Sequence, residues 1–246
     1  MKKIITTLAF LALPASGIAA QGGFPLKHAP IDPHNNTSLQ SGAALFVNYC
    51  MGCHSLEYQR YNRMARDIGL TDKQVKENLI FTGAKVGETM KNAMPKPEAK
   101  KWFGVTPPDL TLIARSRGID YIYTYLLTFY EDPSRPFGVN NAVFPNAGMP
   151  HILWSLQGMQ KPIYEIHKDA EGHETQVIKG FELVKKGSLS PTAFEKKMAD
   201  LTNFLAYAGE PIKRERQRLG IWVILFLLLA SAVFYLLKKE YWRDVH

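Results

Sequence analysis

The sequence predicts a mainly α-helical exported domain, with inserted loops and one small β-hairpin, joined to a single C-terminal transmembrane helix. Three observations support this fold class. A long apolar segment lies near the C-terminus, residues 41–54 and 190–209 have helical patterns, and residues 162–184 alternate weakly in polarity. Residues 21–212 are enough to bury one substantial core and contain no repeat or break in composition.

Residues 1–20 have the pattern of a signal peptide. Two lysines precede the apolar run IITTLAFLAL, and the small residues of PASGIAA follow it. The apolar run is shorter than the roughly 20 residues that cross a bilayer. We therefore expect cleavage near Ala19 or Ala20 and export of residues 21–212.

The segment from Leu219 to Leu237 has no charged residue over 19 positions and is bracketed by the basic stretches KRERQR and KKEYWR. Tyrosine and tryptophan lie near both ends, where such rings favour the headgroup region of a bilayer. This pattern predicts one transmembrane helix over residues 219–237. Basic residues on both sides leave its orientation open, but the export signal places residues 21–212 outside the cytoplasm and residues 238–246 inside it.

The net charge of +8 does not indicate a nucleic-acid-binding surface. The ends of the chain carry most of this charge, since residues 21–212 hold 21 Lys and Arg against 19 Asp and Glu. The exported domain is thus nearly neutral, and we expect no nucleic-acid partner.

The stretch VNYCMGCHSL holds both cysteines of the chain, Cys50 and Cys53, with His54 directly after them. A structural zinc site needs four ligands, and the sequence offers neither a second cysteine pair nor a His-x-x-x-His to complete them. A redox pair of the C-x-x-C type usually opens a helix after a strand, whereas the pattern before this pair is already helical. Zinc and dithiol redox chemistry are therefore the weaker interpretations.

The pattern C-x-x-C-H is typical of covalent haem attachment. The two thiols bond to vinyl groups at two edges of the flat ring, and the adjacent imidazole coordinates the iron. Export fits this chemistry, because c-type attachment takes place outside the cytoplasm. The sequence therefore predicts one haem c, bound covalently through Cys50 and Cys53 and coordinated by His54.

Residues 41–54 are expected to form a helix that leads into the haem. Every fourth residue shares one face of this helix, namely Gly42, Phe46, Cys50 and His54. Gly42 has no side chain, so another helix could cross closely there.

Residues 190–209 predict the partner helix. Ser190 is its expected N-cap, Pro191 lies in its first turn, and Gly209 is its expected stop. Its apolar stripe comprises Phe194, Met198, Leu201, Leu205 and Ala208.

A haem iron in an electron carrier commonly takes methionine as its second axial ligand. Met64 and Met198 fall in helical patterns and are expected in the core. The methionines in loop-like sequence are Met90, Met94, Met149 and Met159. Met94 and Met149 both precede a proline, so local sequence leaves the choice between them open. His151 is a further candidate beside Met149.

Two shorter patterns predict local structure. The sequence TDKQ at residues 71–74 has the form of a capping box, for a helix that ends at Gly83. Residues 162–184 alternate around Glu171 and Gly172 and predict the hairpin.

Beyond these local patterns, the chain resembles the cytochrome c1 family through most of its mature length. The similar stretches are CMGCHSLEYQRY, KPEAKKWFGVTPPDLTLIARSRGIDYIYTYLLTFYEDP, FPNAGMPHILW and FLAYAGEPIKRERQRLG. The haem motif is common to many cytochromes, whereas the PPDLTLIARSRG block joined to one late transmembrane helix is far more specific. The resemblance implies a cytochrome c-like haem domain.

The resemblance also implies a ligand set. Cys50 and Cys53 would form the thioether bonds, His54 would be the proximal ligand, and Met149 would be the distal ligand. In the family a glycine follows Phe-Pro ahead of this methionine, whereas the present chain has Asn146 at that place.

Two further residues match the family near a haem propionate. Arg117 resembles the arginine that pairs with the propionate, a role that suits a bidentate guanidinium. Tyr121 resembles the aromatic residue close to it. A plain surface charge is the alternative interpretation of Arg117.

The function implied is that of the haem-carrying electron-transfer subunit of a quinol:cytochrome c oxidoreductase, with no substrate-converting site of its own. Expected partners are cytochrome b, the Rieske iron–sulfur protein and a soluble or membrane-tethered periplasmic cytochrome c, within a dimeric complex. The expected location is the bacterial inner membrane, with a single span and the haem domain on the periplasmic side.

Two alternatives and one departure remain at this stage. A free-standing membrane-anchored cytochrome c serving another oxidase or reductase would share the motif, the export signal and the anchor, and a non-redox module with zinc at the cysteines is the second alternative. The departure is that the chain lacks the acidic run and the longer insert of mitochondrial relatives. Docking of a strongly basic cytochrome c is therefore not expected, and steering should be modest and local.

Overall fold

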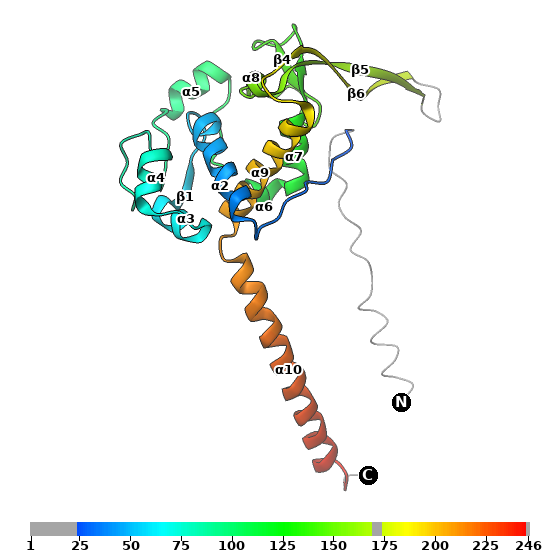
Figure 1. Ribbon diagram of the computed structural model, residues 1–246. Coiled ribbons are helices and arrows are strands. Elements are labelled where there is room, and N and C mark those ends of the chain that lie inside the picture. The colour runs from blue at the N-terminus through cyan, green and yellow to red at the C-terminus, as the bar shows by residue number, and fades with distance from the viewer. Residues whose placement is uncertain (1–23, 169–173, 245–246) are drawn as a thin grey trace.

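The computed structural model describes residues 24–168 and 174–244. Helices make up about half of the described residues and far outnumber strand residues, and the long helix α10 (Lys213–Tyr241) leaves the domain at one end (Figure 1). The predicted mainly α-helical class is confirmed. The signal peptide expected at residues 1–20 and the hairpin turn expected at Glu171 and Gly172 lie outside the described residues.

Helices α2 (Asn36–Leu45) and α9 (Pro191–Gly209) cross next to each other in the domain (Figure 1). A Cβ atom added to Gly42 would collide with the carbonyl oxygen of Asp200 and would lie 2.6 Å from Cβ of Phe204. Only glycine allows the two backbones to approach so closely. The predicted crossing at Gly42 is confirmed.

Helix α9 begins as its sequence predicts. The Ser190 hydroxyl accepts a hydrogen bond from the Ala193 N–H at 3.3 Å, and Pro191 is the first helical residue. Gly209 is the last helical residue, and the chain turns at Glu210. The apolar stripe is buried along its whole length, at Phe194, Met198, Leu201, Leu205 and Ala208.

The helix that leads into the cysteines is not α-helical throughout. After α2, the residues Phe46–Cys50 form a π-helical turn, η2, in which the Met51 N–H donates to the Phe46 carbonyl at 2.9 Å. A π-helical turn contains one residue more than an α-helical turn, so the residues after it are displaced around the helix surface. Such turns are frequent at functional sites. The expected four-residue recurrence therefore ends at Phe46, and His54 lies beyond the helix.

One side of the domain consists of helices α3 (Tyr61–Ile68) and α4 (Asp72–Asn78), beside the antiparallel strands β1 (Leu56–Arg60) and β2 (Thr89–Met90). The predicted capping box is present, because Thr71 and Gln74 bond reciprocally at the start of α4. The helix ends at Asn78 rather than at Gly83. Leu79 already leaves the helical conformation, with a φ of −129°, and packs into the core.

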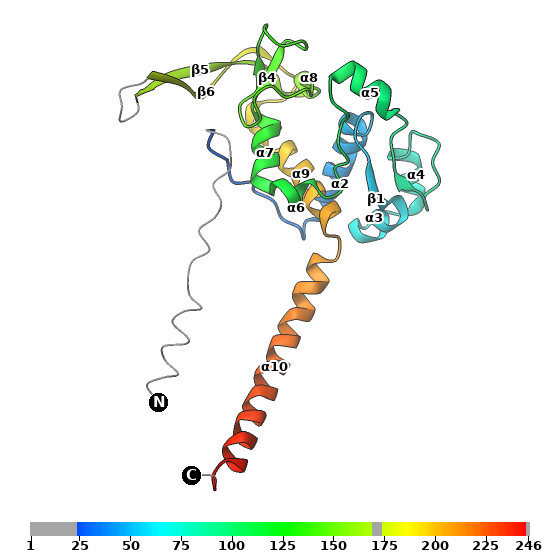
Figure 2. The same ribbon diagram turned by 180° about the vertical axis from the view of Figure 1, so that it is seen from behind.

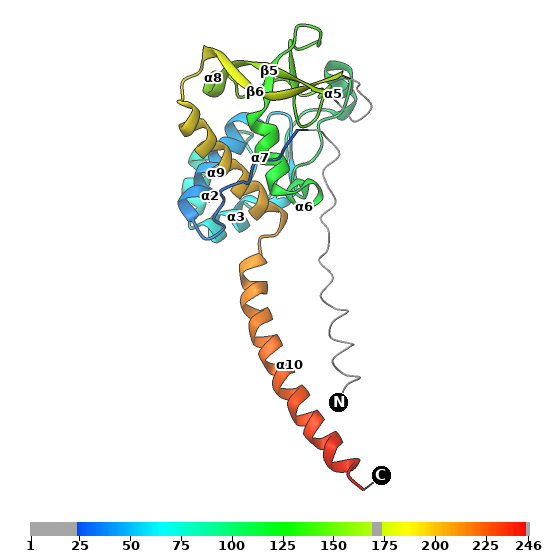
Figure 3. The ribbon, with the colours of Figure 1, turned by 90° about the vertical axis from the view of Figure 1, so that its right-hand side faces the viewer.

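The remaining elements of the domain are short. They are α5 (Lys96–Phe103), α6 (Ile113–Arg117), α7 (Ile119–Leu127), β3 (Phe129–Glu131), β4 (Val139–Asn141) and α8 (Trp154–Gln157). Strands β3 and β4 pair antiparallel. Helices α5 and α8 lie at the end of the domain that faces away from α10 (Figures 2 and 3).

Strands β5 (Gly158–Lys168) and β6 (Glu174–Lys186) form an antiparallel hairpin that projects from the domain (Figure 1). The predicted hairpin is confirmed, and it extends further at its base than expected. Gly158 begins it with a φ of +92°, at a place where a Cβ atom would collide with the Lys185 carbonyl oxygen. This glycine permits the close approach that closes the base.

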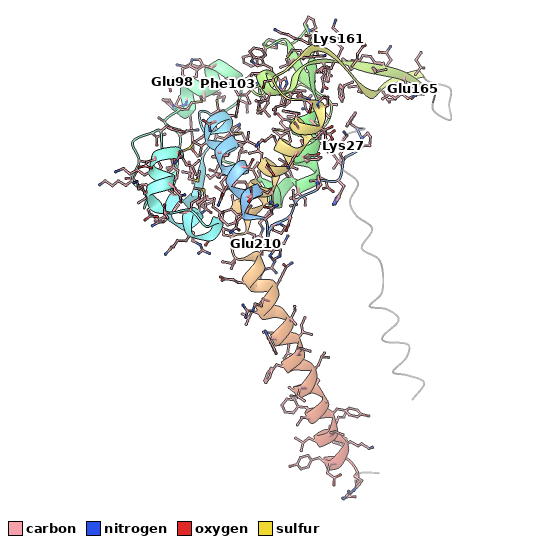
Figure 4. All side chains as sticks on the ribbon, viewed as in Figure 1. Lys27, Glu98, Phe103, Lys161, Glu165 and Glu210 are labelled. Carbon is pink, nitrogen blue, oxygen red and sulfur yellow. The ribbon has the colours of Figure 1, made fainter. Side chains whose placement is uncertain are left out.

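Helix α10 is long and apolar enough to cross a membrane, and it contains the whole segment from Leu219 to Leu237. The basic stretch before this segment belongs to the same helix. Glu210 lies at the junction of α9 and α10 (Figure 4). It accepts two hydrogen bonds from the Arg216 guanidinium, at 2.6 and 2.7 Å.

The core lies between α2, α3, α7 and α9. Met64 and Met198 are completely buried in it, as predicted. Met90, which local sequence placed in a loop, is also completely buried, because the short strand β2 turns it inward.

Candidate functional site

The two cysteines, His54 and Met149 meet at one cleft. Its empty volume is about 530 Å³, and its wall contains no charged residue. Residues from three stretches of the chain line it, namely Tyr49, Cys50, Cys53, His54, Phe103, Val105, Pro107, Pro108, Gly148, Met149, Pro150 and Ile152. The side chain of Phe103 is seen at the end of the domain that faces away from α10 (Figure 4). The fold thus brings together residues up to about 100 positions apart in sequence.

The imidazole of His54 is held by the backbone. Its Nδ1 atom lies 2.7 Å from the carbonyl oxygen of Pro108, which can only accept a hydrogen bond, so Nδ1 carries the proton. The lone pair of Nε2 is therefore free to bind a metal. Burial lowers the pKa of His54, which keeps the ring neutral, as a metal ligand must be.

The two thiols do not have the properties of a redox dithiol. Cys50 is buried, and burial raises its pKa to about 12, with a further contribution from Cys53. Burial also raises the pKa of Cys53. Reactive C-x-x-C pairs depend on a lowered thiol pKa.

A zinc site also lacks support. Among residues 24–168 and 174–244, no group of three or more His, Cys, Asp or Glu side chains could hold a metal ion. A structural zinc site needs four such ligands.

Met149 is the methionine that lines the same cleft as the cysteine motif. It lines the cleft between Gly148 and Pro150, whereas Met94 lines other cavities that do not include His54. Of the two methionines between which local sequence did not choose, Met94 and Met149, the position in the cleft favours Met149. Met149 also accepts a hydrogen bond from the hydroxyl of Tyr125 at 3.5 Å.

His151 does not reach the cleft. Its ring stacks on Phe129, with a centroid distance of 5.1 Å and an interplanar angle of 4°, and it is buried. It is therefore a packing residue beside the methionine loop. The candidate role as an iron ligand is not supported by this position.

The turn before Met149 contains Asn146, the residue that stands where the family pattern has glycine. Asn146 has a φ of +65°, and it is the only non-glycine residue with a positive φ in the described part of the chain. Asparagine tolerates this left-handed conformation better than other residues with a Cβ. Its N–H donates to the side chain of Asn140 at 2.8 Å, and Arg135 donates to its carbonyl at 3.3 Å. Asn146 thus adopts the positive φ that a glycine at this position would also allow.

Arg117 and Tyr121 lie beside the cleft rather than in its wall. The Arg117 guanidinium is 5.7 Å from the centroid of the Tyr121 ring, and Tyr121 stacks on Tyr125 at 6.3 Å and 10°. Since Tyr125 bonds to Met149, these residues form a continuous row along α6 and α7 towards the cleft. Arg117 is exposed at the outer end of this row.

Tyr125 is the site residue that sequence reasoning did not find. It lies four positions after Tyr121 and so shares its face of α7. The four-residue spacing could have indicated that the two tyrosines lie on the same side of α7. The contact of Tyr125 with Met149, however, depends on how the loop that carries Met149 packs against α7.

A haem c fits the residues that are present. The cleft offers two thiols for covalent attachment. It also offers one imidazole nitrogen with a free lone pair and one thioether sulfur, which are the donors of His and Met axial ligation. Its walls are apolar and aromatic, as suits a flat hydrophobic ring. Electron transfer would use the iron of this group, while the protein fixes its ligands.

Comparison with known proteins agrees with this reading. The chain matches the Cytochrome C1 family over residues 26–245. It is 50% identical to cytochrome c1 of Allochromatium vinosum over 246 residues, which cover the whole of both chains. It is 25% identical to a mitochondrial cytochrome c1 haem protein of Solanum tuberosum, over 86% of this chain and 82% of that one.

A further relative has a different name. The ammonia monooxygenase gamma subunit of Nitrosomonas europaea is 44% identical over 239 residues, which cover 97% of each chain. The chain belongs to the cytochrome c1 family, the haem-carrying electron-transfer subunits of cytochrome bc1 complexes.

Proposed function

We propose that this chain binds one haem c covalently through Cys50 and Cys53, with His54 and Met149 as axial ligands. The observation that carries the proposal is that all four residues line one uncharged cleft. The group supplies one-electron chemistry at its iron. The chain has no substrate-converting site of its own in this reading.

Each residue of the cleft has a defined task. His54 is oriented by the Pro108 carbonyl, which fixes the tautomer that presents Nε2. Met149 is held by a turn at Asn146 and by the hydroxyl of Tyr125. The apolar wall, including Phe103 and Val105, excludes water and thereby favours the less charged, reduced state of a bound redox group.

Arg117 and Tyr121 are proposed to face the propionate side. The guanidinium of Arg117 has no carboxylate partner among the described residues. It is therefore available for a bidentate bond to a ligand carboxylate. Its position at the end of the Tyr121 and Tyr125 row supports this assignment.

In the bc1 complex we propose that the subunit receives electrons from the Rieske iron–sulfur protein and passes them to a periplasmic cytochrome c. Residues 21–212 would lie in the periplasm of a bacterial cell, residues 219–237 would cross the inner membrane, and residues 238–246 would lie in the cytoplasm. The length and composition of α10 support the anchor. The complex would be a dimer.

Mass spectrometry of the purified chain tests the covalent group and its number. The mature polypeptide should carry the added mass of one haem, and a c-type absorption band should appear on reduction with dithionite. The paired substitution Cys50→Ala and Cys53→Ala should abolish the adduct. A polypeptide without the adduct, matured in a competent host, would contradict the proposal.

Copurification distinguishes the bc1 assignment from a free-standing membrane cytochrome. Solubilised membranes should yield this chain together with a cytochrome b and an iron–sulfur protein. A chain that purifies alone and still accepts electrons would favour the free-standing alternative. For orientation, a protease added to intact spheroplasts should remove the haem domain.

A further inference from the structure

The mouth of the cleft is an uncharged apolar surface at the end of the domain away from the anchor. Val105 and Ile152 line the cleft and are 53% and 41% exposed. Trp102 on α5 is exposed and lies 6.5 Å, between ring centroids, from Phe103 of the cleft wall. Trp154 on α8 is exposed two positions after Ile152. These helices face away from α10 (Figures 1 and 3). A soluble partner could therefore reach this surface without meeting the membrane.

Lysines flank this apolar centre on both sides. Helix α5 exposes Lys96, Lys100 and Lys101, and Lys96 also lines a cavity that includes Cys53. On the other side, the Lys185 ammonium lies 5.3 Å from the centroid of the Trp154 ring. We define the mouth face as Lys96, Lys100, Lys101, Trp102, Val105, Ile152, Trp154 and Lys185.

Acidic residues are scarce in the stretches that form this face. Residues 47–56, 99–108 and 133–164 contain no Asp or Glu. Glu98 belongs to α5, and Glu57 and Asp109 line the same cavity as Lys96. All three are partly buried, and the Asp109 carboxylate accepts hydrogen bonds from the N–H groups of Glu57 and Thr111. The exported domain as a whole is nearly neutral, so the positive charge of this face is local.

We propose that the mouth face docks a soluble electron carrier whose own docking surface is acidic. This inference rests on the proposed function, and it names the kind of partner. The apolar centre would exclude water from the contact, and the lysines would pair with carboxylates at its rim. Such an arrangement raises the rate of encounter and gives specificity more than affinity.

The lysines of the mouth face favour an acidic partner over a basic one. A basic carrier would bring like charges together at Lys96, Lys100 and Lys101, which slows association and costs free energy. An electron-transfer complex is also typically small and short-lived, so charge at the rim has a large share in its formation. Rim charges act mainly on the association rate and are screened by salt.

The test uses the intact detergent-purified bc1 complex that contains this chain, with decylubiquinol as the donor. Two acceptors are compared: horse heart cytochrome c, which is basic, and the same protein after succinylation of its lysines. For each, kcat/KM for the acceptor is measured from about 10 mM to about 200 mM ionic strength, over which the Debye length falls from about 30 Å to below about 8 Å. With the native chain, kcat/KM for the succinylated acceptor should fall as salt rises, and that for the unmodified acceptor should rise.

The paired substitution Lys100→Glu and Lys101→Glu should lower kcat/KM for the succinylated acceptor by about tenfold at low ionic strength and reverse its salt dependence. The matched control is Lys73→Glu with Lys76→Glu on α4, which changes the net charge equally. The control should change kcat/KM by less than about twofold, because those positions are outside the mouth face. Resin-coupled succinylated cytochrome c gives a readout that needs no turnover, since it should retain the native complex and release the Lys100 and Lys101 variant at lower salt.

Three results would overturn the inference. These are a native kcat/KM for the basic acceptor that falls with salt, an equal loss in the control, and a variant that binds the resin like the native complex. Failure of the proposed function would give a different result from failure of this inference. In that case the native complex would reduce neither the succinylated nor the unmodified cytochrome c with electrons from quinol. The absorption band of the haem in each variant shows that the site itself is intact.

Discussion

The hydroxyl of Tyr125 lies 3.5 Å from the sulfur of Met149, and the two residues are 24 positions apart in the chain. Burial raises the pKa of Tyr125, with a smaller contribution from Tyr121, so this hydroxyl stays protonated and can donate. A donor to a thioether withdraws electron density from the sulfur. The pair is thus placed to tune the electron affinity of an iron bound to Met149.

Tyr125→Phe should lower the midpoint potential of the haem by about 20 to 60 mV, which corresponds to the net free energy of one hydrogen bond in a one-electron couple. The measurement is a spectroelectrochemical titration of the purified complex. Tyr123→Phe is the control, because Tyr123 is a buried tyrosine of the same helix, whereas the hydrogen bond to Met149 in the described part of the chain comes from Tyr125. An equal shift in both variants would argue against a role for the bond.

Met149→Leu should lower the potential by more than about 60 mV, a tenfold change in the redox equilibrium, because the iron would lose its thioether ligand. The spectrum of the oxidised protein should change as well. Met94→Leu should leave both unchanged, since Met94 lines other cavities. The opposite pattern would transfer the distal ligand to Met94.

Asn146→Ala should lower the free energy of unfolding by about 1 kcal/mol, because alanine in the left-handed region has no side chain that stabilises it. For a chain of this size the midpoint temperature should fall by about 2 to 4 °C. Asn146→Gly should be tolerated, since glycine adopts this φ without strain. Thermal unfolding of the holoprotein, followed by its visible spectrum, measures both. Equal stability of the alanine and glycine variants would show that φ is not the constraint.

Gly42→Ala should lower the free energy of unfolding by about 2 kcal/mol or more. The Cβ atom of the new alanine would collide with the Asp200 backbone where α2 crosses α9. The yield of mature holoprotein and its midpoint temperature should both fall. Gly87→Ala is the matched control, since a Cβ atom there meets nothing within 4 Å. A Gly42→Ala variant as stable as this control would mean that the helices can separate without loss.

The local elements followed closely from local sequence. Ser190 and Pro191 start α9, Thr71 and Gln74 form their capping box, and the alternation at residues 162–184 becomes a hairpin. The two helix starts depend on hydrogen bonds within a few residues, so neighbours in the chain determine them. The errors lay where contacts from elsewhere intervene. The π turn before Cys50 and the early end of α4 are both examples.

By itself, the sequence determined which atoms could bind a haem, because C-x-x-C-H carries its chemistry in adjacent residues, and it determined the apolar helix that can serve as an anchor. The tertiary structure decided that Met149 lines the same cleft as His54, that Tyr125 bonds to Met149, and that His151 stacks on Phe129 outside that cleft. The reason is that a ligand distant in sequence is selected by how loops pack on the crossing of α2 and α9. Side-chain type and spacing do not encode that packing.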